Sequence, residues 1–374
     1  MKFIQVLSLF ITIYSLQACN NSTNSSDTKT GDSTTAITSG SDKKDLLHPK
    51  DPKPAWAPEI DDEMWAVILR LQRFNAPPLE TLTAVEARKQ PTPTDAVKAL
   101  IAESGIEVPA SKVDTSGLDI PVKGGTVHAR IYTPQKADSS YPVIVYYHGG
   151  GWVIADLDVY DAGPRALAEK VNAVVVSVHY RQAPEHKFPT AHEDAFAAYQ
   201  WVLANAAKIK GNAKKVAVAG ESAGGNMACN VSIMARDKKI MMPLYQLLVY
   251  PVANNDMNSA SYQQYATSKP LSKPLIEWMV KQYLPDPSKA ADPRIALVKA
   301  NLKGLPSTTI IGAEIDLLQT EGKLLADKLK EAGVDVNYKL YKGVTHEFFG
   351  MAAVVPDAKD AQETAAGDLK KALK

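Results

Sequence analysis

The chain has 374 residues, enough for one large domain or two small ones, and its 45% hydrophobic and 22% charged residues are those of an ordinary soluble globular protein. A formal net charge of +1, without any basic run, argues against a nucleic-acid-binding or other polyanion-binding surface. The two cysteines, Cys19 and Cys229, lie far apart in the chain, which excludes a disulfide framework. Because the sequence contains neither a Cys-x-x-Cys nor a His-Glu-x-x-His motif, we expect no metal site.

The N-terminal residues have the pattern of an export signal. Met1-Lys2 supplies a charged start, and Phe3 to Leu16 form an apolar run. The run ends in Leu-Gln-Ala-Cys19, which resembles the lipobox of bacterial lipoproteins, in which the cysteine thiol carries the lipid. We therefore expect residues 1–18 to be a lipoprotein signal peptide and Cys19 to anchor the exported protein to a bacterial membrane, in the periplasm or at the cell surface. An ordinary signal peptide followed by a chance cysteine is the alternative.

Polar residues follow the signal, and we expect residues 19–57 to be a disordered tether, because a stretch of mostly Ser, Thr, Asn, Asp, Gly and Lys has nothing to bury. Residues 58–105 then show apolar side chains at helical spacing behind an acidic start. These helices precede the first strand, so they predict part of a helical cap. Residues 253–303 contain no strand signal, and we expect them to supply the rest of the cap, including a helix at Pro274 to Leu284.

Strand and helix signals alternate through the rest of the chain. Short apolar runs predict strands at Thr126–Thr133, Val143–Tyr147, Ala173–Val178, Val216–Ala219, Leu244–Tyr250, Thr308–Ile311 and Val336–Tyr341. Helical patterns lie between most of these runs, and a last one lies at Asp360–Leu373. This alternation predicts an α/β fold for residues 58–374, a doubly wound, mostly parallel sheet of about eight strands that meets its ligands at the carboxyl ends of the strands.

A Gly-x-Ser-x-Gly motif follows the strand predicted at Val216–Ala219. Glycines at Gly220 and Gly224 would let neighbouring backbone segments pass close to a tight strand-to-helix turn, so that the hydroxyl of Ser222 stands exposed above the sheet. The backbone N–H of Ala223 would begin the next helix, where the helix dipole favours a developing negative charge. The motif alone is equally compatible with an ordinary βα turn that contains an incidental serine.

A run of three glycines, His148-Gly-Gly-Gly-Trp-Val153, follows the strand predicted at Val143–Tyr147. Glycines leave backbone N–H groups unshielded, and with the N–H of Ala223 these groups could form an oxyanion hole. A phosphate-binding loop is the alternative, but Trp-Val follows the glycines where a phosphate loop has Lys and Ser or Thr. We expect His148 to order this loop by hydrogen bonding.

A nucleophilic serine needs a general base and an acid that orients the base. His346 follows the strand predicted at Val336–Tyr341 and is the candidate base. Asp316 and Glu314 both follow the strand predicted at Thr308–Ile311, and composition alone does not separate the two as the acid. The order Ser222, acid, His346 is the one associated with α/β-hydrolases.

Together, the motifs His-Gly-Gly-Gly-Trp and Gly-Glu-Ser-Ala-Gly-Gly, with Tyr180-Arg-Gln-Ala-Pro-Glu-His-Lys-Phe-Pro189 between them, resemble the hormone-sensitive lipase-like family of bacterial esterases. The resemblance runs from about Pro58 to the C-terminus. It implies Ser222 as nucleophile, His346 as base, Asp316 rather than Glu314 as acid, and the N–H groups of Gly149, Gly150 and Ala223 as oxyanion donors. The segment departs from the family pattern at Leu317, Thr320 and Glu347.

These observations predict a carboxylic ester hydrolase that acts on small-molecule esters through an acyl-serine intermediate and needs no cofactor. Bulky side chains in both cap segments predict a short apolar pocket and a preference for short- to medium-chain acyl groups. A non-catalytic small-molecule-binding protein on the same fold and an amide hydrolase with the same triad are the alternatives. The sequence leaves the oligomeric state open, including a homodimer.

Overall fold

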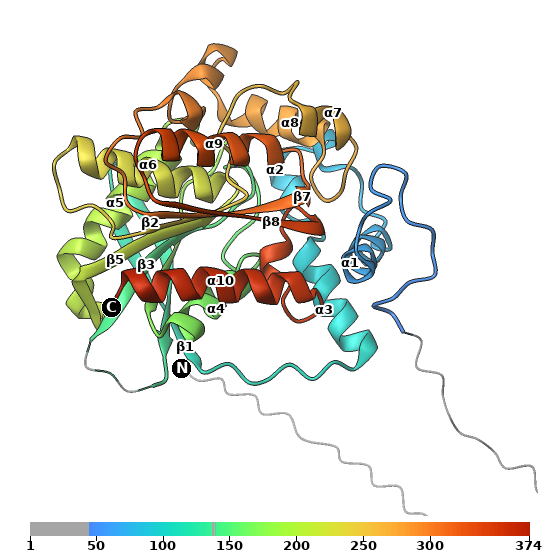
Figure 1. The fold of residues 1–374 in the computed structure, drawn as a ribbon, viewed down its shortest axis with the longest axis horizontal. Coiled ribbons are helices and arrows are strands. Elements are labelled where there is room, and N and C mark those ends of the chain that lie inside the picture. The colour runs from blue at the N-terminus through green and yellow to red at the C-terminus, as the bar shows by residue number, and fades with distance from the viewer. Residues whose placement is uncertain (1–44, 137, 139) are drawn as a thin grey trace, which may run out of the picture. The chain divides into compact units, whose positions relative to one another are not determined.

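Near-continuous runs of Val, Ile and Ala form the centre of a single eight-stranded sheet in the computed structural model, which describes residues 45–374 except 137 and 139 (Figure 1). The strand order is β1-β2-β4-β3-β5-β6-β7-β8; β2 pairs antiparallel with β1 and β4, and all the other pairs are parallel. The predicted doubly wound, mostly parallel sheet is confirmed. The strands are β1 (Val113–Val122), β2 (Gly125–Pro134), β3 (Tyr141–Tyr147), β4 (Val174–His179), β5 (Gly211–Glu221), β6 (Gln246–Val249), β7 (Thr308–Ile315) and β8 (Val336–Thr345).

Helices cover both faces of the sheet, with α4 and α10 on one face and α5, α6 and α9 on the other (Figure 1). Strands covered on both sides have no solvent-facing side chains, which explains why the central strands show continuous rather than alternating apolar residues. These covering helices are α4 (Ala162–Val171), α5 (Thr190–Asn205), α6 (Ala223–Asp237), α9 (Gln319–Glu331) and α10 (Pro356–Ala372).

Both predicted cap segments contain helices. Residues 58–105 form α1 (Asp62–Gln72), the short helices η1 (Leu79–Thr81) and α2 (Ala84–Ala87), and α3 (Pro93–Ser104); residues 253–303 form α7 (Ala260–Gln264), α8 (Lys273–Tyr283) and the short helices η3 (Pro287–Ala291) and η4 (Leu297–Lys299). The remaining short helices are η2 (Ala206–Ile209) and η5 (Phe348–Gly350). The helix predicted at Pro274–Leu284 corresponds to α8, whose N-cap Ser272 accepts a hydrogen bond from the N–H of Leu275.

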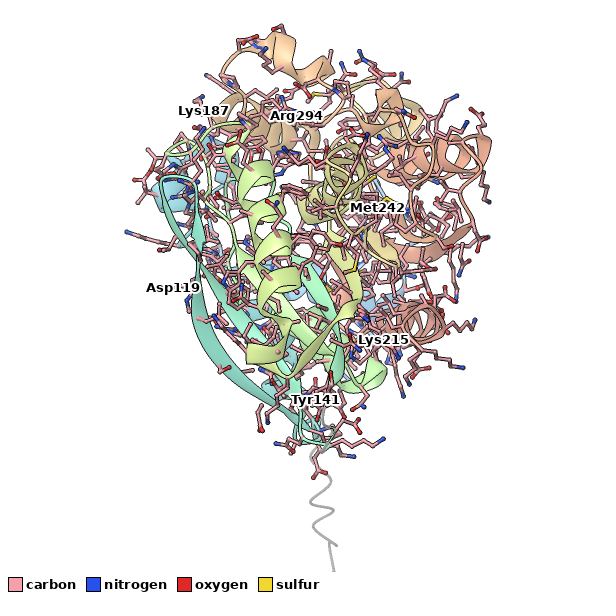
Figure 2. All side chains as sticks on the ribbon, turned by 90° about the vertical axis from the view of Figure 1, so that its left-hand side faces the viewer. Asp119, Tyr141, Lys187, Lys215, Met242 and Arg294 are labelled. Carbon is pink, nitrogen blue, oxygen red and sulfur yellow. The ribbon has the colours of Figure 1, made fainter. Side chains whose placement is uncertain are left out.

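The carboxyl ends of the parallel strands point toward the part of the molecule that carries α7 and α8. Tyr141, the first residue of β3, lies at one end of the view in Figure 2, whereas Lys187 and Arg294 lie at the opposite end. The loops that follow β3, β5, β7 and β8 therefore meet at the end where the sequence places the functional residues.

The signal peptide, Cys19 and residues 19–44 of the tether lie outside the described residues. Residues 45–57, which the sequence assigns to the tether, contain no helix or strand but contact α1. Trp65 donates a hydrogen bond to the carbonyl of Asp51 at 3.3 Å, and Ala57 is fully buried. Among the described residues, no helix combines the length and apolar character that crossing a membrane requires.

Candidate active site

Ser222 occupies the sharp turn between β5 and α6. Its backbone has φ 57° and ψ −119°, a strained conformation for a residue with a side chain, and its N–H donates to the carbonyl of Val249 at 2.8 Å. A side chain at Gly224 would overlap the carbonyl of Tyr147, and one at Gly220 would overlap the backbone of Gly224. Only glycine fits at both positions, as the Gly-x-Ser-x-Gly spacing predicts.

The structure brings three of the predicted residues together. His346 Nε2 lies 3.0 Å from the hydroxyl oxygen of Ser222, and His346 Nδ1 lies 2.7 Å from Oδ2 of Asp316. The other oxygen of Asp316 accepts the N–H of Leu318 at 3.0 Å, which fixes the orientation of the carboxylate. All three side chains are buried, and hydrogen bonds of this geometry can pass a proton from the serine to an oriented imidazole.

Glu314, the other candidate for the acid, forms a hydrogen bond with a backbone N–H group rather than with His346. Its Oε2 accepts the backbone N–H of Gly343 at 2.9 Å, in the last part of β8, directly ahead of His346. The N–H of Asp61, ahead of α1, donates to the carbonyl of the same Gly343 at 2.9 Å. Glu314 therefore positions the histidine segment, while Asp316 contacts the imidazole itself.

The loop after Asp316 departs from the family pattern at Leu317 and Thr320. Ser261 from α7 forms hydrogen bonds to both of these residues. The Ser261 hydroxyl donates to the carbonyl of Leu317 at 2.5 Å and accepts the N–H of Thr320 at 3.2 Å. The N–H of Ser261 donates to the hydroxyl of Thr320 at 3.2 Å. This reciprocal set of hydrogen bonds links the second cap segment to the loop that carries the acid.

The environment of His346 favours its protonated form. Burial opposes the charge, but the carboxylate of Asp316, together with the nearby carboxyl groups of Glu347 and Glu221, outweighs burial and raises the pKa of His346. An imidazole with a raised pKa is a stronger base and holds a proton more firmly once it has accepted one.

The glycine-rich loop presents unpaired donors beside Ser222. In the described part of the chain, no hydrogen-bond acceptor is found for the N–H groups of Gly149, Gly150 or Ala223. The φ of 92° at Gly150 turns the loop, and the hydroxyl of Tyr180 donates to the carbonyls of His148 and Gly149, each at 3.0 Å. As expected, His148 orders the loop: Nδ1 bonds the Gly149 carbonyl at 2.8 Å, and burial lowers the pKa of this histidine to about 3.

An apolar pocket opens at Ser222. It holds about 650 Å³, including its open mouth, and α8 supplies one wall. Of the bulky residues that the sequence places over the site, those on one face of α8 line the pocket: Ile276, Met279 and Tyr283. Trp278 of α8 is absent from the described lining, because helical spacing turns it away from the pocket. Trp65 and Leu71 of α1 and Phe74, which follows α1, are also absent from it. The pocket could receive a short apolar chain attached to the carbon that Ser222 attacks.

Glu221, which is buried, and Glu347, which is half-buried, lie near the site, and the sequence-based prediction gave neither a role. Glu221 accepts hydrogen bonds from the hydroxyls of Tyr146 and Tyr250, and burial raises its pKa to about 7. Glu347 accepts a hydrogen bond from the hydroxyl of Tyr160 at 3.0 Å. The sequence signal for Glu347 was its place directly after His346, where the family often has glycine, but no sequence signal points to its tyrosine partner.

Two further features lie away from the reaction centre. Arg181 and Asp194 form an ion pair, with Arg181 Nη2 2.6 Å from Asp194 Oδ1. Cys229 on α6 is fully buried, and burial raises the pKa of its thiol to about 12, so it is an unreactive core side chain.

Comparison with known proteins identifies the family. Residues 144–350 match the family model described as the alpha/beta hydrolase fold. The chain belongs to the hormone-sensitive lipase-like family of α/β-hydrolases. Carboxylesterase NlhH of Mycobacterium tuberculosis is 38% identical over 259 residues, which are 68% of this chain and 79% of the relative. An ethyl acetate hydrolase of Pseudomonas putida is 32% identical over 289 residues, which are 76% of this chain and 88% of the relative.

Solved structures of this family agree with the sequence comparison. The thermostable esterase from Pseudomonas putida ECU1011 superposes with a TM-score of 0.78 at 31% identity, covering 85% of this chain and 98% of that structure. The chain is therefore an ester hydrolase, because both its sequence relatives and its structural neighbours in this family are esterases. The similarity extends over the glycine-rich loop, the serine turn and the histidine segment.

Proposed function

We propose that the protein hydrolyses carboxylic esters of short- to medium-chain acids through an acyl-serine intermediate on Ser222. The observation that carries the proposal is the continuous pair of hydrogen bonds from Ser222 through His346 to Asp316, 3.0 Å and 2.7 Å long, beneath an apolar pocket. No comparable hydrogen-bonded set of serine, histidine and acid occurs elsewhere among the described residues.

The geometry supports a two-stage reaction. The Ser222 oxygen attacks the ester carbonyl carbon while His346 accepts the hydroxyl proton and Asp316 stabilises the imidazolium. The carbonyl oxygen becomes an oxyanion bound by the N–H groups of Gly149, Gly150 and Ala223. His346 then protonates the alcohol oxygen, the carbon–oxygen bond breaks and the alcohol leaves. A water molecule, deprotonated by His346, then attacks the carbonyl carbon of the acyl-serine. The bond from this carbon to the Ser222 oxygen breaks, His346 returns the proton to that oxygen, and the carboxylic acid leaves.

The Ser222 pocket supports the chain-length part of the proposal. Each acyl methylene that it buries adds up to ~0.8 kcal/mol of binding, until the chain reaches the pocket wall. We expect kcat/KM to peak at about four to eight acyl carbons, because a pocket of this kind accommodates only a few methylenes. A panel of p-nitrophenyl esters from acetate to palmitate measures this, and a preference for palmitate over butyrate would contradict it.

The decisive experiment for the mechanism is substitution of Ser222 and His346. Ser222→Ala and His346→Ala should each lower kcat on p-nitrophenyl butyrate by ~10⁴-fold or more, since the members of such a set act as a unit. Ser232→Ala, which removes another buried hydroxyl from α6, is the matched control and should retain activity. More than about a tenth of wild-type activity in a folded Ser222→Ala or His346→Ala variant would refute the mechanism.

We also propose that Cys19 carries a lipid that anchors the exported enzyme to a bacterial membrane. Support comes from the charged start, the apolar run and the lipobox-like Leu-Gln-Ala-Cys19. In the native host, Cys19→Ser should abolish incorporation of labelled fatty acid. An unmodified N-terminus downstream of Cys19, found by mass spectrometry of the native protein, would refute the anchor.

A further inference from the structure

A second hollow lies next to the Ser222 pocket. It spans about 590 Å³, including its open mouth, and its lining includes Glu347 and Ile154, which comes from the segment after the glycine-rich loop. Leu271 and Met279 line both this hollow and the Ser222 pocket, so the two share a wall.

The chemistry of ester cleavage assigns the second hollow to the alcohol part of the substrate. The leaving oxygen must reach His346 Nε2 to receive its proton, so the alcohol lies on the histidine side of Ser222. Glu347 is the residue directly after His346, and it lines the second hollow. In the described linings, Ser222 belongs to the first pocket, Glu347 belongs to the second, and His346 belongs to neither. The second hollow is therefore linked to the reaction centre through Glu347 and the shared wall, which leaves the Ser222 pocket for the acyl chain.

Glu347 brings an uncompensated charge to this hollow. Its Oε1 accepts the Tyr160 hydroxyl at 3.0 Å, and among the described residues no other hydrogen bond reaches its carboxylate. No lysine, arginine or histidine nitrogen of the described chain lies within 4.0 Å of it, the distance that defines an ion pair. A half-buried carboxylate without a cationic partner is costly, because burial removes solvating water and, among the described residues, the Tyr160 hydroxyl alone replaces it. Burial accordingly raises the pKa of Glu347.

Arg88, the cationic residue in the described lining of the same hollow, is already paired with the carboxylate of Glu185. Arg88 forms two hydrogen bonds to the carboxylate of Glu185, at 2.9 Å and 2.7 Å, and donates to the carbonyls of Val153 and Ala183 at 2.8 Å and 2.6 Å. Its donors are therefore directed away from Glu347. Among the described lining residues, the carboxylate of Glu347 is the one charge that no neighbour balances.

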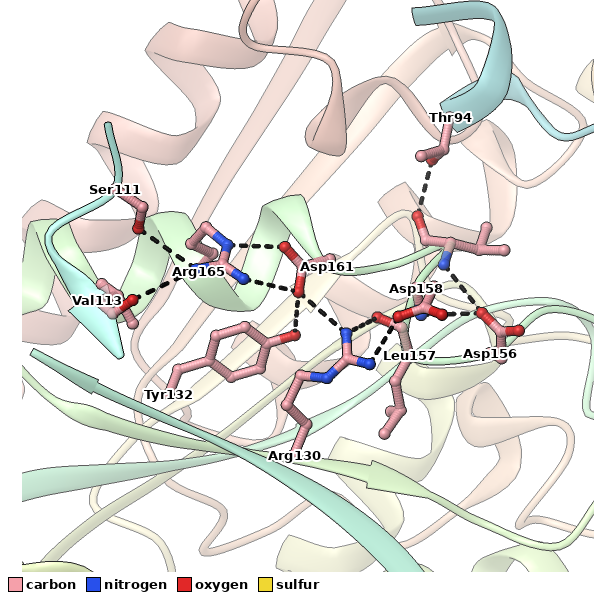
Figure 3. Close-up of polar contacts among 11 residues, drawn as sticks. Thr94, Ser111, Val113, Arg130, Tyr132, Asp156, Leu157, Asp158, Asp161 and Arg165 are labelled. Atoms are coloured by element: carbon pink, nitrogen blue, oxygen red, sulfur yellow. Dashed lines mark hydrogen bonds and ion pairs between the residues drawn. The ribbon is translucent and has the colours of Figure 1, made fainter. Parts of the chain in front are cut away.

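The loop that holds Glu347 through Tyr160 is fixed on both sides of the tyrosine (Figure 3). Asp161 accepts hydrogen bonds from Tyr132 at 2.8 Å, Arg130 at 3.1 Å and Arg165 at 2.7 Å. The carbonyl of Val159 accepts the Thr94 hydroxyl at 2.7 Å. The Tyr160 hydroxyl also packs directly against Gly149 of the glycine-rich loop. The tyrosine therefore holds one oxygen of the Glu347 carboxylate in place beside the reaction centre and leaves the other oxygen available to a ligand.

We propose that the second hollow binds the alcohol part of the ester and that Glu347 selects alcohols bearing a positively charged amine or quaternary ammonium group. This proposal rests on the proposed ester hydrolysis. A neutral hydroxyl could also donate to Glu347, but only a cation supplies the charge that the carboxylate lacks. Glu347 is a specificity-determining residue in this assignment, separate from the residues that move protons.

Two butyrate esters of equal shape test the proposal. Butyrylcholine and 3,3-dimethylbutyl butyrate differ only in a quaternary nitrogen that replaces a quaternary carbon, so the ratio of their kcat/KM values isolates the charge. The wild type should prefer the cationic ester by about tenfold or more, equivalent to about 1.4 kcal/mol. Glu347→Gln should bring the ratio close to one, whatever its effect on overall rate. Glu331→Gln, which removes an exposed carboxylate at the far end of α9, should leave the ratio unchanged.

Other outcomes would overturn the assignment. A wild-type ratio of one or less, or a ratio that is unchanged in Glu347→Gln, would show that Glu347 does not recognise the alcohol.

Should Glu347→Gln fail to fold, Glu347→Gly replaces it, since the φ of 70° at this position suits glycine. Tyr160→Phe keeps the charge and should keep a ratio above one. If no ester is cleaved at all, including p-nitrophenyl butyrate, ester hydrolysis itself is refuted, and this outcome is distinct from an unselective but active enzyme.

Discussion

Asp316 and Glu314 stand two residues apart after the same run of β-forming residues, yet their carboxylates have different partners. Asp316 contacts the imidazole of His346, whereas Glu314 accepts the N–H of Gly343. Asp316→Asn should therefore lower kcat by ~10³-fold or more, because an amide does not stabilise the imidazolium or enforce its tautomer. Glu314→Gln should keep most activity, since the amide oxygen can still accept the Gly343 N–H. Steady-state kinetics on p-nitrophenyl butyrate measures both, and the opposite ranking would identify Glu314 as the acid.

The carboxyl groups around His346 should determine how kcat/KM depends on pH. Burial opposes the imidazolium, but Asp316 and the neighbouring Glu347 and Glu221 raise the pKa of His346. The neutral imidazole is the base, so kcat/KM should fall as the pH drops through this pKa. Glu347→Gln removes one negative charge and should move the acid limb of the profile to lower pH. A profile of kcat/KM for the neutral ester 3,3-dimethylbutyl butyrate measures this, and an unchanged or upward-shifted limb would contradict it.

At the scale of single residues, the sequence predicts the functional residues that lie in motifs. It misses residues that come into contact only in the folded protein. Ser222 and the glycine-rich loop could be found because glycine spacing encodes a backbone shape. The choice between Asp316 and Glu314 required a family resemblance, because both follow the same predicted strand, Thr308–Ile311. Tyr160 and Glu347 are separated by 187 positions, and no local pattern records their contact.

At the scale of elements, Glu321 joins α9 to the loop after β6. Its Oε1 accepts the N–H groups of Ala253 and Asn254 at 2.7 Å and 3.3 Å. Burial raises the pKa of Glu321 from 4.5 to about 8, although these two N–H groups oppose the change. A raised folded-state pKa means that the folded protein binds this proton more tightly than the unfolded chain. The associated stabilisation is complete below pH 4.5 and is lost as the pH rises to about 8.

Glu321→Gln should remove this pH dependence, because the amide oxygen keeps the two backbone hydrogen bonds and carries no charge. Relative to the variant, the wild type should lose free energy of unfolding between pH 4.5 and about 8, as measured by urea denaturation across that range. Glu331→Gln, at an exposed position of the same helix, is the control and should show no such trend. A difference between wild type and Glu321→Gln that stays constant with pH would contradict the prediction.

The sequence predicts buried elements more readily than exposed ones. The central strands and α4, α5, α6 and α9 could be found because each buries a continuous or periodic set of apolar side chains. Strand β1 is absent from the sequence-based prediction, because its run Val-Asp-Thr-Ser-Gly-Leu-Asp-Ile-Pro-Val is mostly exposed and lies at the edge of the sheet. Its pairing with β2, rather than its own composition, makes it a strand.

At the scale of the whole molecule, truncation separates the polar N-terminal segment from the helices that support the site. Residues 20–45 are too polar to bury a core, and the apolar run before Cys19 belongs to the predicted export signal, so a variant beginning at Asp45 should be soluble and retain full kcat/KM on p-nitrophenyl butyrate. A variant beginning at Gly105 loses α1, whose side chains Met64, Val67 and Ile68 are fully buried, and with it the Asp61 contact to Gly343.

The longer truncation should therefore expose apolar surface and weaken the support of the histidine segment at the same time. We expect lower solubility and at least a tenfold loss of kcat/KM, which corresponds to ~1.4 kcal/mol of transition-state stabilisation. Asp61→Ala in the full chain separates the two causes, since it keeps α1 and the backbone hydrogen bond to Gly343 and should retain most activity. Equal activity of the variants that begin at Asp45 and at Gly105 would show that the first helical segment does not support His346.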